Sequence, residues 1–219
     1  MLNRELISAA IPALHPNDTV FQALGLMSDF HVGQLPVVAD DKYVGLVFES
    51  ELLNLDEASA VQTAEAHLSK VAVHADRHFY EAVQAANDYH LSIVPVTDKG
   101  DEFLGVIEST NLLLQLGKTM GTSEPGGLII LEMDQLNFSF SEISKLVETN
   151  DAHITQLNTF WDNNTSTFQV TMKINKFEIS DIVATFQRYD YQVKYYYGEE
   201  TYENELKSNY DHLMNYLGI

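Results

Sequence analysis

The sequence predicts a mixed α+β or α/β chain: a repeated helix-strand-strand-helix unit, then a domain with the element order βαββαβ, then an amphipathic helix. Three observations support this prediction. A long segment recurs 59 residues later, a glycine-rich run follows the second copy, and strands of alternating polarity follow that run. We therefore expect two domains of different architecture in one chain.

The repeat begins at Leu14 and again at Val73. Its offset aligns residues of the same type at several positions: His15 with His74, Ala23 with Ala82, His31 with His90, and Pro36 with Pro95. One extra residue in the second turn then places Gly45 opposite Gly105. Chance rarely produces such a register, so we expect two copies of one supersecondary unit.

Each copy opens with an amphipathic helix, because apolar residues recur at i, i+3, i+4 and i+7. Two strands rich in β-branched and aromatic residues follow, joined by an acidic turn, and a short helix closes the unit. The predicted strands are 35–39 and 43–48 in the first copy, and 93–97 and 103–108 in the second. Neither copy has enough apolar surface for a core of its own, so the two should pack face to face.

The order of these elements resembles the CBS domain, with LPVVA and YVGLVF in one copy and IVPVT and FLGVIE in the other. The resemblance covers residues 1–118, with copies at 1–60 and 61–118. It implies a cleft between the copies, where many members of the family bind adenine nucleotides, and a homodimer formed through the CBS modules. The residues expected at the cleft are Gln34, Pro36, Phe48, Glu51, Arg77, Ile93, Pro95, Glu108 and Asn111.

The sequence leaves three alternatives for what this cleft binds. Nucleotide-binding CBS domains usually carry G-h-x-[ST]-x-x-[DN], whose hydroxyl contacts phosphate and whose last residue contacts ribose. Here Phe48 and Glu108 replace the hydroxyl, whereas Glu51 and Asn111 keep the sugar-binding chemistry. Arg77 is the cation that we place near the cleft. An adenine nucleotide, an adenosine derivative or other uncharged ligand, and a degenerate cleft without ligand are the three alternatives.

The histidines and the paired acids of the repeat do not predict a metal or catalytic site. His74 and His78 have a spacing that metals can use, but the first copy carries Thr19 in place of His78. We interpret the repeated histidines as hydrogen-bonding groups at helix and strand ends. Asp40 and Asp41 fall in a predicted turn, so acid-base catalysis by them is not expected.

Residues 119–126 form the predicted linker, and residues 127–197 supply the βαββαβ order. The helix at 139–150 should bury Phe140, and strand 167–174 alternates so strictly that one face of the sheet should be covered. This pattern resembles the ACT domain. The resemblance implies an effector loop at Asp134 and Asn137, where asparagine replaces the usual glycine and can adopt the same backbone shape, although its side chain crowds the approach to a ligand. Amino-acid binding and a structural or dimerising role are the alternatives.

The last predicted element lies within residues 198–219. Its apolar side chains are spaced by four, four, three and four residues: Tyr202, Leu206, Tyr210, Leu213 and Leu217. This spacing predicts an amphipathic helix. It could pack on its own sheet, on a second subunit or on another protein.

Composition narrows the class of protein. The chain has 32 acidic and 12 basic residues, a net charge of −20, so we expect no binding to nucleic acid or to an anionic membrane surface. The sequence has no apolar run of membrane-spanning length and no signal-peptide pattern, which predicts a cytoplasmic protein. The absence of cysteine excludes disulfides and thiolate chemistry.

A CBS pair followed by an ACT-like domain resembles the architecture of bacterial acetoin-utilisation-type CBS regulators. This resemblance implies a non-enzymatic, homodimeric sensor that binds a small molecule and signals to a partner by a conformational change. The alternative is a ligand-free dimerisation or interaction scaffold. An enzyme is not expected, because the sequence shows no nucleophile turn, no phosphate-binding glycine loop and no metal-binding helix.

Overall fold

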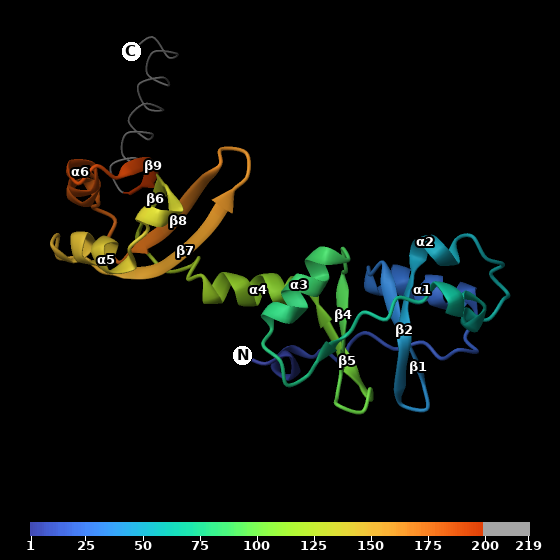
Figure 1. Cartoon of the computed structure of the whole chain (residues 1–219). Coiled ribbons are helices and arrows are strands. Elements are labelled where there is room, and N and C mark those ends of the chain that lie inside the picture. Colours follow the sequence, from blue (N-terminus) through green and yellow to red (C-terminus); the bar gives the residue numbers. More distant parts are fainter. Residues whose placement is uncertain (199–219) are drawn as a thin grey trace, which may run out of the picture. The chain divides into compact units, whose positions relative to one another are not determined.

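The computed structural model describes residues 1–198, except for the side chains of residues 65–67. The helix predicted within residues 198–219 therefore lies outside the described residues. The chain divides into two compact units, Met1–Gly117 and a second unit that begins at Lys118 (Figure 1).

The first unit contains both copies of the repeat, and the predicted strands and helices are confirmed. The first copy comprises α1 (Val20–Phe30), β1 (Gln34–Ala39), β2 (Lys42–Phe48) and α2 (Glu49–Leu52). The second comprises α3 (Tyr80–Asp88), β4 (Ile93–Thr97), β5 (Phe103–Glu108) and α4 (Ser109–Thr119). Three short elements that were not predicted complete the unit: η1 (Asn3–Leu6), η2 (Val61–His67) and β3 (Val73–His74).

Local signals explain where α1 begins and ends. Thr19 caps its first turn by accepting a hydrogen bond from the Gln22 amide, and the Gln22 side chain bonds back to the Thr19 amide at 2.9 Å. His31 ends the helix in the left-handed conformation, with φ of 53°. His90 has the same φ after α3. The repeated histidine therefore stands where the chain must leave a helix.

The two copies share one hydrophobic core, as expected from the apolar content of each copy. Fully buried side chains come from both: Val20 and Leu46 from the first, and Ile93 and Ile107 from the second. Burying apolar surface between the copies stabilises them as one body, at roughly 25 cal/mol per Å².

Two segments cross from one copy to the other. The start of the chain pairs with the second copy, where the Ser8 amide donates to the Val106 carbonyl at 2.8 Å. The linker between the copies pairs with the first copy, where the Leu46 amide donates to the Ser69 carbonyl at 2.8 Å. Figure 1 shows the start of the chain beside β4 and β5. Residues 1–8, which the sequence suggested belong to the first copy, thus pack on the second.

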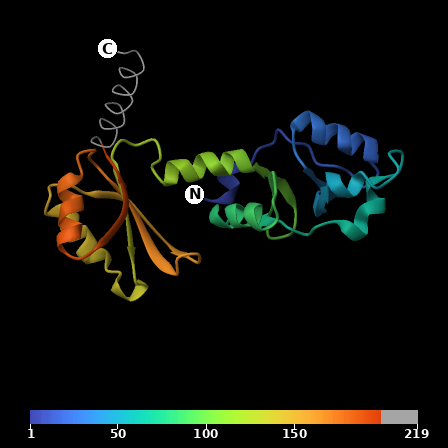
Figure 2. The same ribbon diagram turned by 90° about the horizontal axis from the view of Figure 1, so that it is seen from above.

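The second unit forms the predicted βαββαβ order. Its elements are β6 (Gly127–Met133), η3 (Gln135–Asn137), α5 (Phe140–Glu148), β7 (Ile154–Asp162), β8 (Thr167–Ile174), α6 (Ser180–Arg188) and β9 (Gln192–Tyr197). The sheet order is β7-β8-β6-β9, with every pair antiparallel. This is a ferredoxin-like arrangement. Figures 1 and 2 show α5 and α6 on the same face of the sheet.

Two details of this unit differ from the prediction. Phe140, the first residue of α5, is 54% exposed, and Leu146 joins Ile143 and Val147 in the core. Gln169 was expected on an open, solvated face but is only 6% exposed. Its amide donates to the Asp162 carboxylate at 3.1 Å, so polar neighbours cover it.

Candidate functional site

Several residues predicted at the CBS cleft are parts of the core. Pro36, Ile93 and Pro95 are buried within their strands. Gln34 is 6% exposed, and its side chain joins the two copies. Its oxygen accepts from the Ser92 amide at 3.0 Å and from the Ser92 hydroxyl at 2.6 Å, and its nitrogen donates to the His90 carbonyl at 3.3 Å. The polar groups of the Gln34 side chain therefore hold the two copies together.

The segments that would contact phosphate and ribose lie at equivalent strand ends. Phe48 is the register partner of Gln34, and Glu108 is the register partner of Ile93. Phe48 packs against the core and offers no hydrogen bond, while Glu108 brings a negative charge. These two positions hold no group that attracts phosphate.

Glu51 keeps an available acceptor. Its Oε2 atom is buried and has no hydrogen-bond partner among the described residues. A buried oxygen without a donor costs roughly 1–3 kcal/mol. A ligand hydroxyl could satisfy this atom. Asn111, its counterpart in α4, is half-buried.

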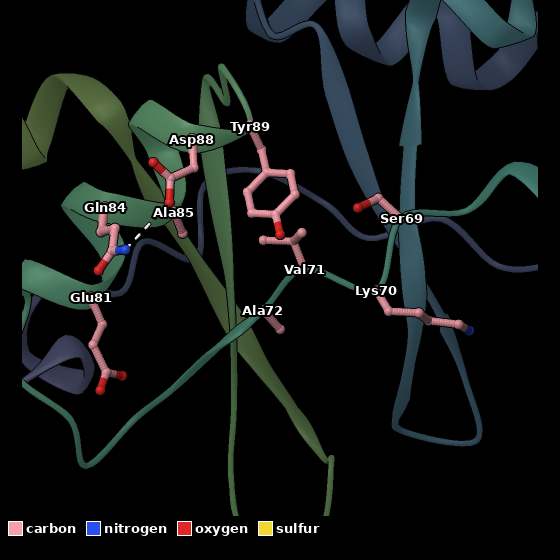
Figure 3. A pocket seen from close by; sticks show the side chains of 9 residues that line it. All are labelled: Ser69, Lys70, Val71, Ala72, Glu81, Gln84, Ala85, Asp88 and Tyr89. Atoms are coloured by element: carbon pink, nitrogen blue, oxygen red, sulfur yellow. Dashed lines mark hydrogen bonds between the residues drawn. The ribbon is translucent and has the colours of Figure 1, made fainter.

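A cavity of about 520 Å³ lies between helix α3 and the linker that joins the copies (Figure 3). Its lining residues are Ser69, Lys70, Val71, Ala72, Glu81, Gln84, Ala85, Asp88 and Tyr89. Figure 3 shows the Tyr89 ring extending from the end of α3 toward Val71. The cavity thus combines a small apolar floor, an aromatic ring and several hydrogen-bonding groups.

The charged groups of this cavity are mainly acidic. Lys70 directs its ammonium away from α3 toward β2, where it donates to the Val44 carbonyl (Figure 3). Asp88 accepts a hydrogen bond from Gln84 at 3.4 Å, and Glu81 lies 3.8 Å from the Arg77 guanidinium. The exposed Arg77, which precedes α3, is thus paired with an acid in the first turn of that helix. Such a lining disfavours phosphate and suits a ligand with hydroxyl or amino donors.

The linker side of the cavity is fixed to the first copy. Besides the Ser69–Leu46 pairing, the Tyr43 hydroxyl donates to the Val71 carbonyl at 2.8 Å. Burial raises the pKa of Tyr43 well above its ordinary value of 10.0, so this donor stays protonated at neutral pH. The other side of the cavity, α3, belongs to the second copy. A ligand here would contact the linker, which is bonded to the first copy, and helix α3 of the second copy.

The sequence analysis missed this cavity because Glu81, Gln84 and Asp88 form the polar stripe of an amphipathic helix, which usually faces solvent. One feature of the sequence could have indicated this cavity, namely a difference between the first helices of the two copies. The first copy carries Gly25 where the second has Gln84, and Phe30 where the second has Tyr89. Only the second helix therefore offers hydrogen bonds at both positions.

The predicted effector loop lines a separate hollow of about 580 Å³ in the second unit, to which both Asp134 and Asn137 contribute. Asn137 does not have the positive φ that a glycine often adopts in such a loop. It lies in η3, because the Asp134 carboxylate accepts from the Leu136 amide at 2.9 Å and starts a helical turn. Three further carboxylates line the hollow, from Glu132, Glu142 and Asp190, and would repel the carboxylate of an amino acid.

Two ionisable groups of this hollow are shifted by their neighbours. The Thr167 hydroxyl and the Lys194 ammonium, the latter 3.0 Å away, lower the pKa of Glu132. Burial, together with the charge of Glu142, raises the pKa of Tyr191. Glu132 is thus committed to an ion pair within the sheet.

The described residues contain no group suited to a metal ion and no candidate membrane span. No three histidine or acidic side chains come close enough to hold a metal ion. Within residues 1–198, no helix has the length and apolar character of a membrane span.

Known proteins resemble the first unit of this chain in sequence and in fold. Residues 4–57 match the model of the CBS domain family. A CBS domain pair/ACT domain protein from Thermotoga maritima has a similar fold, with a TM-score of 0.51 and 21% identity, over 55% of this chain and 99% of that chain. CBSX2 in complex with AMP gives a TM-score of 0.47 and 19% identity, over 54% of this chain and 97% of that chain.

One curated relative is an uncharacterized protein of Methanocaldococcus jannaschii. It is 23% identical over 101 residues, which make up 46% of this chain and 34% of that protein. The chain therefore spans about a third of the length of this relative. The first unit has the fold of a CBS domain pair, and the second has the ferredoxin-like fold expected of an ACT-like domain.

Proposed function

We propose that this chain, whose first unit has the fold of a CBS domain pair, is a non-enzymatic regulatory sensor of a small uncharged metabolite. The ligand binds in the cavity between α3 and the linker, and the change is passed to a partner in the cytoplasm. The cavity itself carries this proposal, because one wall is bonded to the first copy and the other is a helix of the second. Binding would fix the two copies relative to each other.

The lining chemistry favours a nucleoside-like ligand over a nucleotide. Tyr89 offers an aromatic face, and base stacking on such a ring is worth about 1–3 kcal/mol. Glu81 and Asp88 can accept hydrogen bonds from hydroxyl or amino groups but would repel phosphate. We therefore propose an adenosine derivative or another uncharged ring compound, and we expect AMP and ATP to bind more weakly.

Thermal denaturation with adenosine, AMP and ATP tests the ligand, since a compound that binds the folded state raises the melting temperature. We expect the largest increase with adenosine or a related nucleoside, and a several-fold weaker affinity after Tyr89→Ala. Phe30→Ala, the equivalent change in the first copy, is the matched control and should keep the response. No shift with any compound, or an equal loss in both variants, would reject the sensor.

A homodimer through the CBS modules is part of the proposal. Apolar side chains are exposed at equivalent positions of both copies: Phe21 and Tyr80 at the start of the first helix, and Leu53 and Leu113 in or after the second. Exposed apolar residues that recur in both copies suggest a surface that another molecule covers.

The second candidate function is a ligand-free scaffold. The burial of Pro36, Ile93 and Pro95, together with the structural role of Gln34, favours it, because these residues were expected to line the cleft. A scaffold would dimerise normally and show no thermal response to any metabolite.

A further inference from the structure

The sheet of the second unit has an open face whose centre is apolar. On β6, Ile129 and Leu131 point into the core beneath the helices, so Leu128 and Ile130 lie on the opposite face. Strand β6 is an inner strand of the sheet, and on an open face such positions are usually polar. An apolar centre here indicates a surface that something covers.

Tyrosines of the neighbouring strand β9 extend this surface. Tyr197 is the register partner of Leu128, and Tyr195 is the register partner of Ile130. Both tyrosines are more than half exposed, at 53% and 54%. We call these four residues the open-face patch.

Polar interactions border the open-face patch on two sides, and the exposed ring of Phe160 on β7 lies farther along the same face, beyond Gln169. Toward β8, the Lys173 ammonium donates to the Gly121 carbonyl, so the linker covers that side. At the far end of β6, Glu132 pairs with Lys194 at 3.0 Å and accepts from Thr167 at 2.5 Å. The open-face patch is therefore an apolar surface with satisfied polar borders.

The chain leaves the sheet directly beside this patch. Tyr197 is the last residue of β9, and Gly198 follows it at a fixed position, because a side chain there would meet the Phe177 carbonyl oxygen at 2.4 Å. The sequence continues for 21 residues beyond Gly198 and carries the apolar stripe from Tyr202 to Leu217. At 1.5 Å per residue a helix over this stripe would be about 22 Å long, enough to cross four strands spaced by about 4.8 Å.

We propose that the open-face patch is the docking surface for residues 202–217 of the same chain. A segment tethered a few residues away has a high effective concentration, typically in the millimolar range. A second copy would have to overcome the repulsion between chains that each carry a net charge of −20. This inference does not depend on the proposed ligand, since it concerns the other unit.

Because this chain contains no cysteine, introduced cysteines permit a specific crosslinking test on residues 1–219. One cysteine is placed on the patch as Ile130→Cys, and a second on the stripe as Leu206→Cys or Leu213→Cys. Tyr195→Cys serves as a second, exposed anchor if the change at Ile130 impairs folding. The matched controls pair each anchor with Ser208→Cys or Asn215→Cys, which lie off the stripe.

Treatment with a short bismaleimide, followed by denaturing electrophoresis and mass spectrometry, identifies the occupant. We expect crosslinked monomer from the stripe positions, at a yield several-fold above that of the off-stripe controls. Crosslinked dimer as the main product would overturn the proposal in favour of a second copy. Equal yields from stripe and off-stripe positions, or no crosslink from either anchor, would also overturn it.

Discussion

At the scale of single residues, the first unit uses its polar side chains mainly to hold its two copies together. Gln34 makes three hydrogen bonds to Ser92 and His90 across the copies. Tyr43 fastens the linker through Val71. Glu51 is different, since its buried Oε2 has no partner among the described residues. An unpaired buried oxygen lowers stability unless a ligand supplies a donor.

This contrast predicts that one substitution stabilises the fold. Glu51→Met removes the unpaired oxygen and keeps the length of the side chain, so we expect the free energy of unfolding without ligand to rise by about 1 kcal/mol. The thermal shift caused by a nucleoside should stay the same, because Glu51 does not line the cavity between α3 and the linker. Urea denaturation and the thermal shift assay measure the two quantities.

Glu49→Met, an exposed change in the same helix, is the control for Glu51 and should alter neither quantity. A fall in stability in Glu51→Met would show that its carboxylate has a structural role, and a lost nucleoside response would place the ligand at Glu51 instead of beside Tyr89.

Acid sensitivity of the second unit should depend on Glu132. Because its pKa in the folded state lies below the ordinary value of 4.5, its interactions stabilise the fold above pH 4.5. That contribution is lost as the pH falls through the folded-state pKa. Glu132→Gln should therefore flatten the loss of stability below pH 4.5, as measured by urea midpoints between pH 3 and 7. Glu124→Gln, an exposed change, should leave the profile unchanged, and an unaltered profile in Glu132→Gln would refute this assignment.

At the scale of elements, each copy is crossed by a segment from the other half of the unit. A Cβ added to Gly45 would meet the Leu68 Cβ at 2.8 Å, and one added to Gly105 would meet the Ile7 Cγ2 at 2.6 Å. Gly105 also has a φ of 135°, which other residues rarely adopt. The repeated glycine therefore makes room for the crossing segment.

We expect Gly45→Ala and Gly105→Ala each to lower the free energy of unfolding by about 1–3 kcal/mol, through crowding against the crossing segment. Gly25→Ala is the matched control, since it lies inside α1 with no atom within 4 Å of the added Cβ. This control should raise stability by up to about 1 kcal/mol through helix propensity. Urea denaturation of the three variants checks the prediction, and equal effects at all three glycines would contradict it.

At the scale of the whole molecule, the exposed apolar residues of the two copies suggest how chains associate. Leu53 is 67% exposed and Leu113 is 70% exposed, although they follow equivalent buried leucines, Leu52 and Leu112. One leucine of each pair builds the core, and the other remains available on the surface. A homodimer formed through these helices would bury the exposed side chains of Leu53 and Leu113.

The double variant Leu53→Glu, Leu113→Glu should shift the protein from dimer to monomer, because it places charges in an apolar interface of an already acidic chain. We expect at least a tenfold weaker association in sedimentation equilibrium, with the melting temperature little changed. The control is Leu136→Glu, a 92% exposed leucine of the second unit. Unaltered association in the double variant would exclude this surface from the dimer.

The sequence by itself determined the elements and their order. Apolar and β-branched patterns placed β4, β5 and β8 almost to the residue, since these patterns depend on local geometry. The small apolar content of each copy also predicted that the two copies share one core, and the absence of a hydroxyl donor from Phe48 and Glu108 argued against phosphate.

Only the tertiary structure decided which polar residues remain available to a ligand. Gln34 was expected at a cleft, but its partners Ser92 and His90 lie 56 to 58 residues away and cannot be identified from local pattern. The cavity beside Tyr89 likewise exists because the linker is bonded to the first copy while α3 belongs to the second. Periodicity indicates which side of a helix is polar, whereas long-range contacts decide whether another segment lies beside that side and forms an open cavity with it.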